Sequence, residues 1–493
     1  MTEMLWLAAA AAALAFLCFS LWWSRYRVMP PSRVEERAAA RFPDGFLWGA
    51  GEDAYQHEGS SFNNDWSRWE RTTPAPIDRG AVQERGSDFW NKWREDLARA
   101  AGDHHNAHRI GLEWSRIEPS PGVYDHEALS RYRDMLRTMK EQHRFTTFVN
   151  LWHFTLPLWA ADDGGWENPR LMERWRAYVQ LCARELGPWV DWWSTMIDSQ
   201  IYALTGYLIA EIPPCVADTQ RALRVYRIMI DAHAVAYREI KASTRSPDGT
   251  DAKVGQIYFF FDVHRRGFLI DVPIRRVFER VFNWALLDAL STGRVDLLLP
   301  RAARVREVDE SCAHTLDWIG VNYFTRAVSS FAPLSPGFVS AARQTPWTTS
   351  DLDWEIYPEG LHRTLTQVHR RYPGVPLFVT ECGLADADDS RRPRFIVDHV
   401  AWTHRALEDG VDVRGFFYWS LTDNWEWKRG PWPRFGLYEV DYATGARRAR
   451  PSAALFADIA RTNALPATLP PSVLRAQRES RLPEDLDPAR RGK

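Results

Sequence analysis

Short apolar runs alternate with longer amphipathic stretches along most of the chain. Nearly continuous apolar runs of this kind are typical of strands that are buried on both faces of a parallel sheet. We predict such strands at residues 46–50, 107–112, 146–151, 192–197, 254–260, 318–322, 377–381 and 413–419. Apolar residues with a helical period predict helices between them, at residues 90–101, 126–142, 169–186, 219–242, 275–290, 360–371 and 394–409.

Eight strand–helix units in this order predict an α/β fold, namely a (β/α)8 TIM barrel with enlarged βα loops. A doubly wound sheet is the alternative, but no glycine-rich phosphate loop follows the first predicted strand. Polar residues with possible functions follow nearly every predicted strand. This distribution favours the barrel, because its loops at the carboxyl ends of the strands converge on one site.

The N-terminus has a different pattern. Residues 4–23 are uncharged, and a helix of about 20 apolar residues can cross a bilayer, so we predict one transmembrane helix here. Basic residues follow this segment instead of preceding it. By the positive-inside rule this predicts a single-pass membrane anchor with the barrel on the cytoplasmic side. The alternative is a signal peptide, or an anchor with the domain outside.

We therefore divide the chain into four parts. Residues 1–27 are the predicted anchor and its flank, residues 28–41 a linker, residues 42–464 the barrel, and residues 465–493 a tail rich in proline and charge. Such a tail is expected to have little packed structure.

Charge and cysteine content exclude several classes of partner. A net charge of −2 argues against a nucleic-acid partner, and five scattered cysteines argue against a disulfide framework and for a reducing compartment. The run His104-His105-x-x-His108 lacks the helical spacing and the Glu of a metalloprotease site. We predict no metal and no cofactor, and the oligomeric state stays open.

Two carboxylates stand where predicted apolar strands end: Glu381 on the seventh strand and Asp198 directly after the fourth. A carboxylate in such a place is costly unless it is paired or takes part in chemistry. Other polar and aromatic side chains near strand ends are Gln56, Arg109, His153, Tyr323, Trp419, Glu426 and Trp427. Sugar hydroxyls need partners that donate and accept hydrogen bonds, and a sugar ring suits an indole face. The mixture therefore predicts a sugar site.

These motifs resemble glycoside hydrolase family 1, the β-glucosidase family. The similar segments are Phe46-Leu47-Trp48-Gly49 through Gln56-x-Glu58-Gly59, His153-Phe154-x-Leu156-Pro157, Thr380-Glu381-x-Gly383, Trp419-Ser420-Leu421-x-Asp423-Asn424-x-Glu426-Trp427, and Arg434-Phe435-Gly436-Leu437 with Val440-Asp441. The resemblance covers about residues 42–458. It implies a retaining β-glycosidase that acts on a small-molecule β-glycoside, and the predicted membrane anchor adds a lipid-linked β-glycoside as a candidate.

The resemblance also implies a role for each site residue. Glu381 would be the nucleophile that forms a covalent glycosyl-enzyme, with Arg109 and Tyr323 holding it ionised and oriented. Hydroxyls of the sugar would be bound by Gln56, His153, Glu426 and Trp427, and Trp419 would be the platform beneath the ring. Glu426 would repel a phosphate, so we expect an unphosphorylated sugar.

One motif departs from the family pattern. Where the family has Thr-x-Asn-Glu-Pro with its acid/base Glu, this chain has Thr195-Met196-Ile197-Asp198-Ser199. Ile197 cannot bond to the sugar 2-OH, and Asp198, the candidate acid/base, is one methylene shorter. Three interpretations follow: a working β-glycosidase, a membrane-associated transglycosylase acting on glycolipid, and a non-catalytic sugar- or lipid-binding protein.

Overall fold

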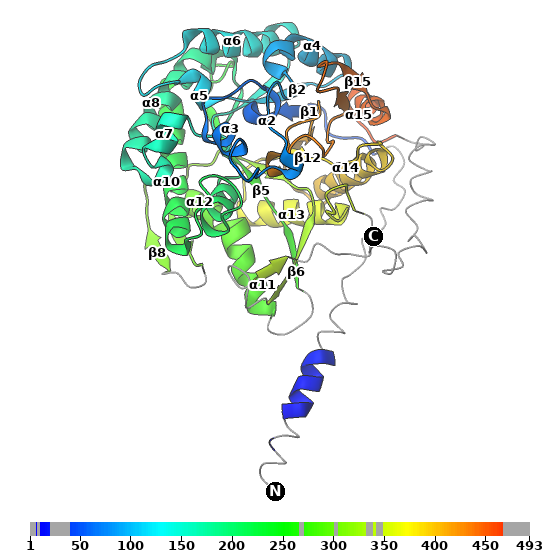
Figure 1. The fold of residues 1–493 in the computed structure, drawn as a ribbon. Coiled ribbons are helices and arrows are strands. Elements are labelled where there is room, and N and C mark those ends of the chain that lie inside the picture. Colours follow the sequence, from blue (N-terminus) through cyan, green and yellow to red (C-terminus); the bar gives the residue numbers. More distant parts are fainter. Residues whose placement is uncertain are drawn as a thin grey trace.

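Eight parallel strands close into a barrel in the order β1-β13-β12-β9-β5-β4-β3-β2 (Figure 1). The computed structural model describes residues 6, 10–19, 40–265, 271–299, 304–331, 339–341 and 349–466. The barrel strands are β1 (Leu47–Glu52), β2 (Ala107–Gly111), β3 (Thr146–Asn150), β4 (Trp192–Ile197), β5 (Lys253–Phe259), β9 (Trp318–Asn322), β12 (Leu377–Cys382) and β13 (Val413–Tyr418). Each predicted strand is confirmed to within one or two residues at either end.

Helices surround the strands (Figure 1). The main ones are α4 (Phe89–Gly102), α6 (His126–Arg137), α8 (Pro169–Leu186), α10 (Thr219–Ser243), α11 (Asp271–Glu279), α12 (Ala285–Thr292), α13 (Pro358–Arg371), α14 (Arg392–Glu408) and α15 (Pro451–Thr462). Local sequence explains where several of them begin. Asn168 caps α8 by accepting from Arg170 N, with proline at the first helical position, and Asp218 caps α10 by accepting from Gln220 N and Arg221 N.

The interior of the barrel changes character along its axis. An apolar cluster fills its middle, made of Ala107, Phe148, Ile197, Ile257, Trp318, Phe378 and Phe417. Side chains two residues apart on a strand point to the same face, so the positions above this cluster also point inward. There the chain carries Arg109 after Ala107, Asn150 after Phe148, and Asn322 four residues after Trp318. The carboxyl ends of the strands therefore surround a group of buried polar side chains above an apolar floor, and we call this group the polar chamber.

Shorter elements lie in the loops between the barrel units. Strands β6 (Asp262–Arg265), β10 (Arg326–Phe331) and β11 (Val339–Ala341) form a small sheet. Two-stranded sheets pair β7 (Arg294–Leu297) with β8 (Val305–Val308), and β14 (Tyr438–Val440) with β15 (Arg447–Ala449). The alternation of apolar and amphipathic stretches did not predict these elements.

The two ends of the barrel region meet. Phe42 N donates to Asn463 O (2.9 Å), Leu465 N donates to Ala40 O (2.9 Å), and Arg41 pairs with Ala464 in an antiparallel bridge. These contacts lie at the limits set for the domain from the sequence. Most of the predicted linker and tail, at residues 28–39 and 467–493, lies outside the described residues.

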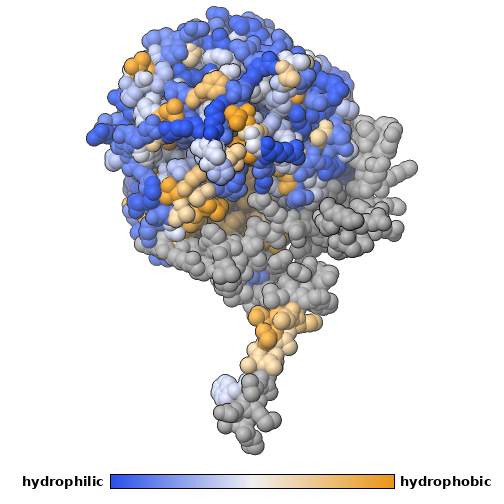
Figure 2. All heavy atoms as spheres, in the orientation of Figure 1, coloured by the Kyte–Doolittle hydropathy of each residue, from blue (hydrophilic) through white to orange (hydrophobic). Residues whose placement is uncertain are grey.

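The predicted transmembrane helix over residues 4–23 is not supported. Within the described residues, no helix combines the length and the hydrophobicity that a membrane crossing requires. The helical stretch at residues 10–19 is apolar and exposed (Figure 2), but at about 1.5 Å per residue it reaches only about half of a hydrocarbon core. Residues 1–5, 7–9 and 20–39 lie outside the described residues. The predicted single-pass location with a cytoplasmic barrel therefore has no support either.

Candidate active site

Glu381 lies at the end of β12 and faces the polar chamber. Arg109 Nη2, from β2, donates to Glu381 Oε1 at 2.7 Å, and only 4% of Glu381 is exposed. Burial raises the pKa of Glu381 well above its usual value, while the Arg109 charge opposes that rise. The predicted contact between Arg109 and Glu381 is thus present, although burial has a larger effect on the pKa of Glu381 than the Arg109 charge.

Tyr323 does not support Glu381 in the way we predicted. Its hydroxyl donates to Tyr357 O at 2.8 Å, because the ring packs over Gly360, where a Cβ would lie 1.9 Å from the phenolic oxygen. Contact with Glu381 runs instead through the backbone, from Tyr323 N to Glu381 O at 2.8 Å. Tyr323 therefore positions the strand end and leaves the carboxylate to Arg109.

Asp198 follows β4 with a left-handed backbone, φ 50° and ψ 38°. Asp tolerates this conformation better than most residues. Asn322 Nδ2, at the end of β9, donates to Asp198 Oδ1 and Oδ2 at 3.3 and 3.4 Å. Burial raises the pKa of Asp198 to about 8, against the opposing effect of the Asn322 amide. At neutral pH the carboxyl group therefore carries a proton.

The two residues beside Asp198 serve the fold. Ile197 is fully buried in the apolar floor of the barrel, packed with Phe148, Ile257 and their neighbours. The Ser199 hydroxyl accepts from Gln256 Nε2 at 3.0 Å, and Gln256 also accepts from the Thr195 hydroxyl. At these two departures from the family motif, Ile197 therefore packs in the apolar floor and Ser199 joins a buried hydrogen-bond network.

Asp53 is a chamber residue to which sequence reasoning gave no role. It follows β1, and its Oδ2 lies 3.2 Å from Arg109 Nη2 and 3.1 Å from His153 Nδ1. Arg109 and His153 hold the pKa of Asp53 at about 2, although burial opposes them as the largest single effect. Asn322 was missed in the same way. Both stand at strand ends, so the rule that singled out Glu381 and Asp198 could have found them.

Gln56 and Trp419 lie where β1 and β13 lead into their loops. Gln56, on the short helix α2 (Ala54–His57), donates from Nε2 to Trp425 O at 3.2 Å. Its Oε1 is buried without a hydrogen-bond partner among the described residues, so an acceptor stays available for a ligand hydroxyl. The Arg109 guanidinium lies 5.5 Å from the Trp419 ring centroid, which places this indole beside the Glu381 pair.

Glu426 and Trp427 belong to the loop after β13. Asn424 Nδ2 donates to Glu426 Oε2 at 2.8 Å, and burial raises the pKa of Glu426 to about 7. The Trp427 ring packs against Trp66 (4.7 Å between centroids) and His153 (4.8 Å). Such packing restrains the indole and the imidazole together. His153 is thus held between Asp53 on one side and this aromatic wall on the other.

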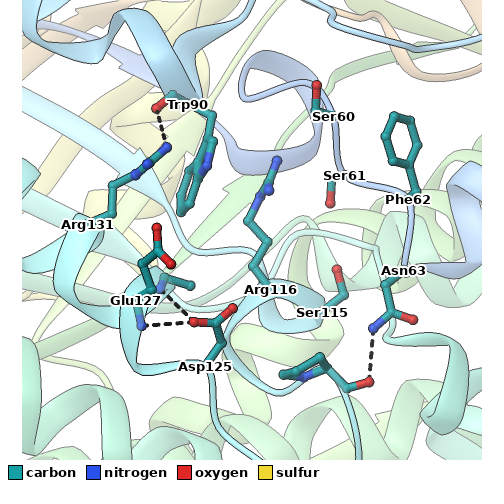
Figure 3. Close-up of a pocket in the computed structure, with 12 residues that line it drawn as sticks. Ser60, Ser61, Phe62, Asn63, Trp90, Ser115, Arg116, Asp125, Glu127 and Arg131 are labelled. Carbon is teal, nitrogen blue, oxygen red and sulfur yellow. Dashed lines mark hydrogen bonds between the residues drawn. The ribbon is translucent and has the colours of Figure 1, made fainter.

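Two cavities outside the chamber contain none of the predicted site residues. The cavity in Figure 3, of about 410 Å³, lies between the loop that carries Ser60 and Asn63 and the start of α6. Its Arg116 is bound to Glu58 (2.7 Å), and Arg116 and Arg131 already cover the Trp90 ring, with guanidinium carbons 4.3 and 4.7 Å from its centroid. A second cavity, of about 490 Å³, is lined by Leu156, Tyr202 and Tyr207, among others.

In the described part of the chain, no group of three or more His, Cys, Asp and Glu side chains is arranged to hold a metal ion. The histidines of the run His104-His105-x-x-His108 have other neighbours. His108 pairs with Glu52 outside the barrel, and the His105 ring packs on Phe456.

The geometry can be compared with known proteins. A model described as glycosyl hydrolase family 1 matches residues 38–465. The chain belongs to this family. It is 31% identical to a beta-galactosidase of Pyrococcus woesei, over 88% of this chain and 100% of that protein. Among solved structures, a beta-glycosidase from Pyrococcus horikoshii matches with a TM-score of 0.79 and 31% identity, covering 90% of this chain and 99% of that one.

A further solved relative shows what such a fold can bind. The beta-glucosidase from Thermotoga maritima, in complex with glucoimidazole, matches this family 1 chain with a TM-score of 0.80 and 26% identity, covering 86% of this chain and 100% of that one. The predicted family, the (β/α)8 barrel and the class of enzyme, a glycoside hydrolase of β-glycosidase type, are confirmed.

Proposed function

We propose that this family 1 protein is a retaining β-glycosidase that hydrolyses O-β-glycosidic bonds of an unphosphorylated sugar through a covalent glycosyl-enzyme on Glu381. Asp198 serves as the acid/base in this proposal. The family membership and the similarity to a beta-galactosidase and a beta-glycosidase support the reaction class. The assignment of individual residues rests on the contacts within the polar chamber.

The position of Asn322 carries the proposal. It donates to Asp198 from one side, and on the other side its Cα is paired in register with that of Glu381. Adjacent strands lie about 4.8 Å apart, which puts Glu381 one strand spacing from Asn322, and the Asn322 amide reaches Asp198 past the intervening strand β5, so the two carboxyl groups flank one residue of β9. Two carboxyl groups on either side of a scissile bond are what glycoside hydrolysis requires.

The protonation of the pair suits a double displacement. Asp198, with a pKa of about 8, can give its proton to the leaving oxygen while Glu381 attacks the anomeric carbon. Asp198, then ionised, takes a proton from the water that releases the sugar. Arg109 favours the ionised form of Glu381 that the first step needs. Because Asp198 has a short side chain, a water can relay the proton.

The remaining chamber residues support the choice of sugar. Gln56 Oε1, which has no hydrogen-bond partner among the described residues, suits a sugar hydroxyl, and so does the imidazole of His153, while Trp419 and Trp427 offer flat surfaces to the sugar ring. Glu426, which can ionise around neutral pH, repels a phosphate group.

Covalent labelling tests the nucleophile. We expect an activated 2-deoxy-2-fluoro-β-glycoside to add one glycosyl group, located by peptide mapping on Glu381, because a good leaving group departs without acid help. Glu381→Gln is the matched control and should stay unlabelled. If the folded wild-type protein gains no mass, the proposed mechanism is wrong, and measured sugar binding without an adduct would instead support the non-catalytic alternative.

Acceptor competition separates hydrolysis from transfer. We expect azide to rescue Asp198→Ala, giving a β-glycosyl azide, while added sugars or glycolipids do not divert the wild-type intermediate. Transfer products that exceed free sugar would favour the transglycosylase over the hydrolase.

A further inference from the structure

A third carboxylate stands in the chamber beside the proposed catalytic pair. Asp53 is 1% exposed and lies at the end of β1, next to Glu52 in the chain. The two neighbours point in opposite directions, since Glu52 pairs with His108 between the barrel and its outer layer, while Asp53 turns inward. Nothing in the proposed double displacement uses the Asp53 carboxylate.

Asp53 and Glu381 share one guanidinium group. Arg109 Nη2 donates to Glu381 Oε1 at 2.7 Å and lies 3.2 Å from Asp53 Oδ2, while Arg109 Nη1 donates to Asp53 Oδ1 at 3.5 Å. A guanidinium group keeps its single charge at any pH that a folded protein survives. The Arg109 charge attracts both carboxylates, but repulsion between Asp53 and Glu381 offsets part of the stabilisation that Glu381 gains from Arg109.

Two glycines leave room for this arrangement. A Cβ at Gly51 would lie 2.8 Å from Arg109 Nε, and a Cβ at Gly111 would lie 2.8 Å from Asp53 Oδ1. Both distances are shorter than a normal contact between a carbon and a nitrogen or oxygen atom. A larger residue at Gly51 would therefore push the guanidinium aside, and one at Gly111 would push the carboxylate aside. The barrel is thus shaped around the Asp53–Arg109 contact.

Asp53 also favours one tautomer of His153. The Nδ1 of His153 lies 3.1 Å from Asp53 Oδ2, and a carboxylate attracts an N–H but repels a ring lone pair, so the hydrogen is favoured on Nδ1. Burial lowers the pKa of His153, so the ring is neutral and its Nε2 keeps a lone pair. A neutral imidazole oriented in this way accepts from a hydroxyl group and cannot donate to one.

We propose that Asp53 is a positioning residue of this site, which divides the Arg109 guanidinium with Glu381 and orients His153 so that Nε2 accepts a hydroxyl of the bound sugar. The proposal rests on the proposed function, because it assigns Glu381 and His153 the roles given there. It adds a residue that tunes the nucleophile and fixes the polarity of one sugar contact.

Several charged or titratable groups face Asp53 from the elements around it. They are Arg109 on β2, His153 after β3, His57 on α2, Asp198 after β4 and Glu381 on β12. The Asp53 charge disfavours ionisation of both Glu381 and Asp198, so its removal lowers the pKa of both groups. Activity needs Glu381 ionised and Asp198 protonated, so both limbs of the pH profile should move to lower pH.

The test is Asp53→Asn, which keeps the shape and removes the charge. We expect both limbs of kcat/KM for an aryl β-glycoside to move down by about one pH unit, since one neighbouring charge commonly shifts a pKa by that much. Glu52→Gln is the matched control, a buried carboxylate one position away that points outside the barrel. Asp53→Ala also removes the acceptor for His153, and KM should rise on the order of tenfold.

Two measurements need no turnover, so they separate this proposal from the proposed function. The pKa of Glu381, followed by ¹³C NMR of labelled glutamate and assigned with Glu381→Gln, should fall in Asp53→Asn. In the wild-type protein, ¹⁵N NMR should show His153 protonated on Nδ1. The inference is overturned if His153 carries its proton on Nε2, or if folded Asp53→Asn leaves the Glu381 pKa and both limbs in place. An inactive wild type with the expected NMR results would count against the proposed function alone.

Discussion

Glu381 and Asp198 both end apolar strands, yet the barrel holds them differently. Glu381 meets a full positive charge, with Arg109 at 2.7 Å. Asp198 meets a neutral amide, Asn322 Nδ2, at 3.3 and 3.4 Å, and its backbone is left-handed. Similar sequence contexts thus meet different hydrogen-bond partners across the barrel: burial raises the pKa of both carboxyl groups, and a bonded cation opposes that rise at Glu381 where a bonded neutral amide opposes it at Asp198.

Removing each carboxyl group in turn should give the largest and clearest difference. We expect Glu381→Gln to lose turnover of every β-glycoside, on the order of 10⁴-fold or more, because the covalent step disappears. Asp198→Asn should lose about 10²–10⁴-fold in kcat/KM on substrates with poor leaving groups and little in kcat/KM on a dinitrophenyl glycoside, because kcat/KM reports the first step, in which only poor leaving groups need the proton. Steady-state kinetics across a leaving-group series measures both. Equal losses on all substrates in both variants would show that Glu381 and Asp198 do not have the separate roles of nucleophile and acid/base.

The amide partner of Asp198 offers a smaller change that acts through pH. Asn322 donates to the carboxyl oxygens and so favours the ionised form, which lowers the pKa of Asp198 from what burial alone would give. Asn322→Ala should therefore raise that pKa and move the alkaline limb of kcat/KM, which we expect near pH 8 in the wild type, to higher pH. The acid limb, set by Glu381, serves as the internal reference. An alkaline limb that stays in place would mean that another group controls it.

The smallest effect is expected beside Asp198, at Ile197. Its side chain is fully buried and packs among apolar residues of the barrel floor. Ile197→Val should lower the free energy of unfolding by about 0.5–1.5 kcal/mol, through the cavity left by one methylene, and leave kcat/KM unchanged. Denaturant unfolding with parallel kinetics checks this. A clear change in KM would place Ile197 at the ligand instead.

Individual elements show where sequence reasoning succeeded. Helix α8 (Pro169–Leu186) was predicted with the observed bounds because proline begins it and a regular apolar period continues through it. The barrel strands were found because burial on both faces leaves a continuous apolar run. The small sheet of β6, β10 and β11 was missed, because pairing between distant loops leaves no local period in the sequence.

The site divides in the same way. Residues at strand ends could be predicted to converge, and Arg109 does reach Glu381. The direction of the Tyr323 hydroxyl could not be predicted, because it depends on the space over Gly360. The place of Asp53 depends likewise on two glycines of neighbouring strands.

Local periodicity and the order of residues were enough to predict the barrel, the family and the strand ends that carry the carboxyl groups. Which groups contact the same charge, and how far burial shifts each pKa, could be read only from the folded chain. Arg109 serves both Glu381 and Asp53, and the buried Asp198 has a pKa of about 8. Charge sharing and desolvation depend on distances between strands that are far apart in the chain, and closure of the barrel sets those distances.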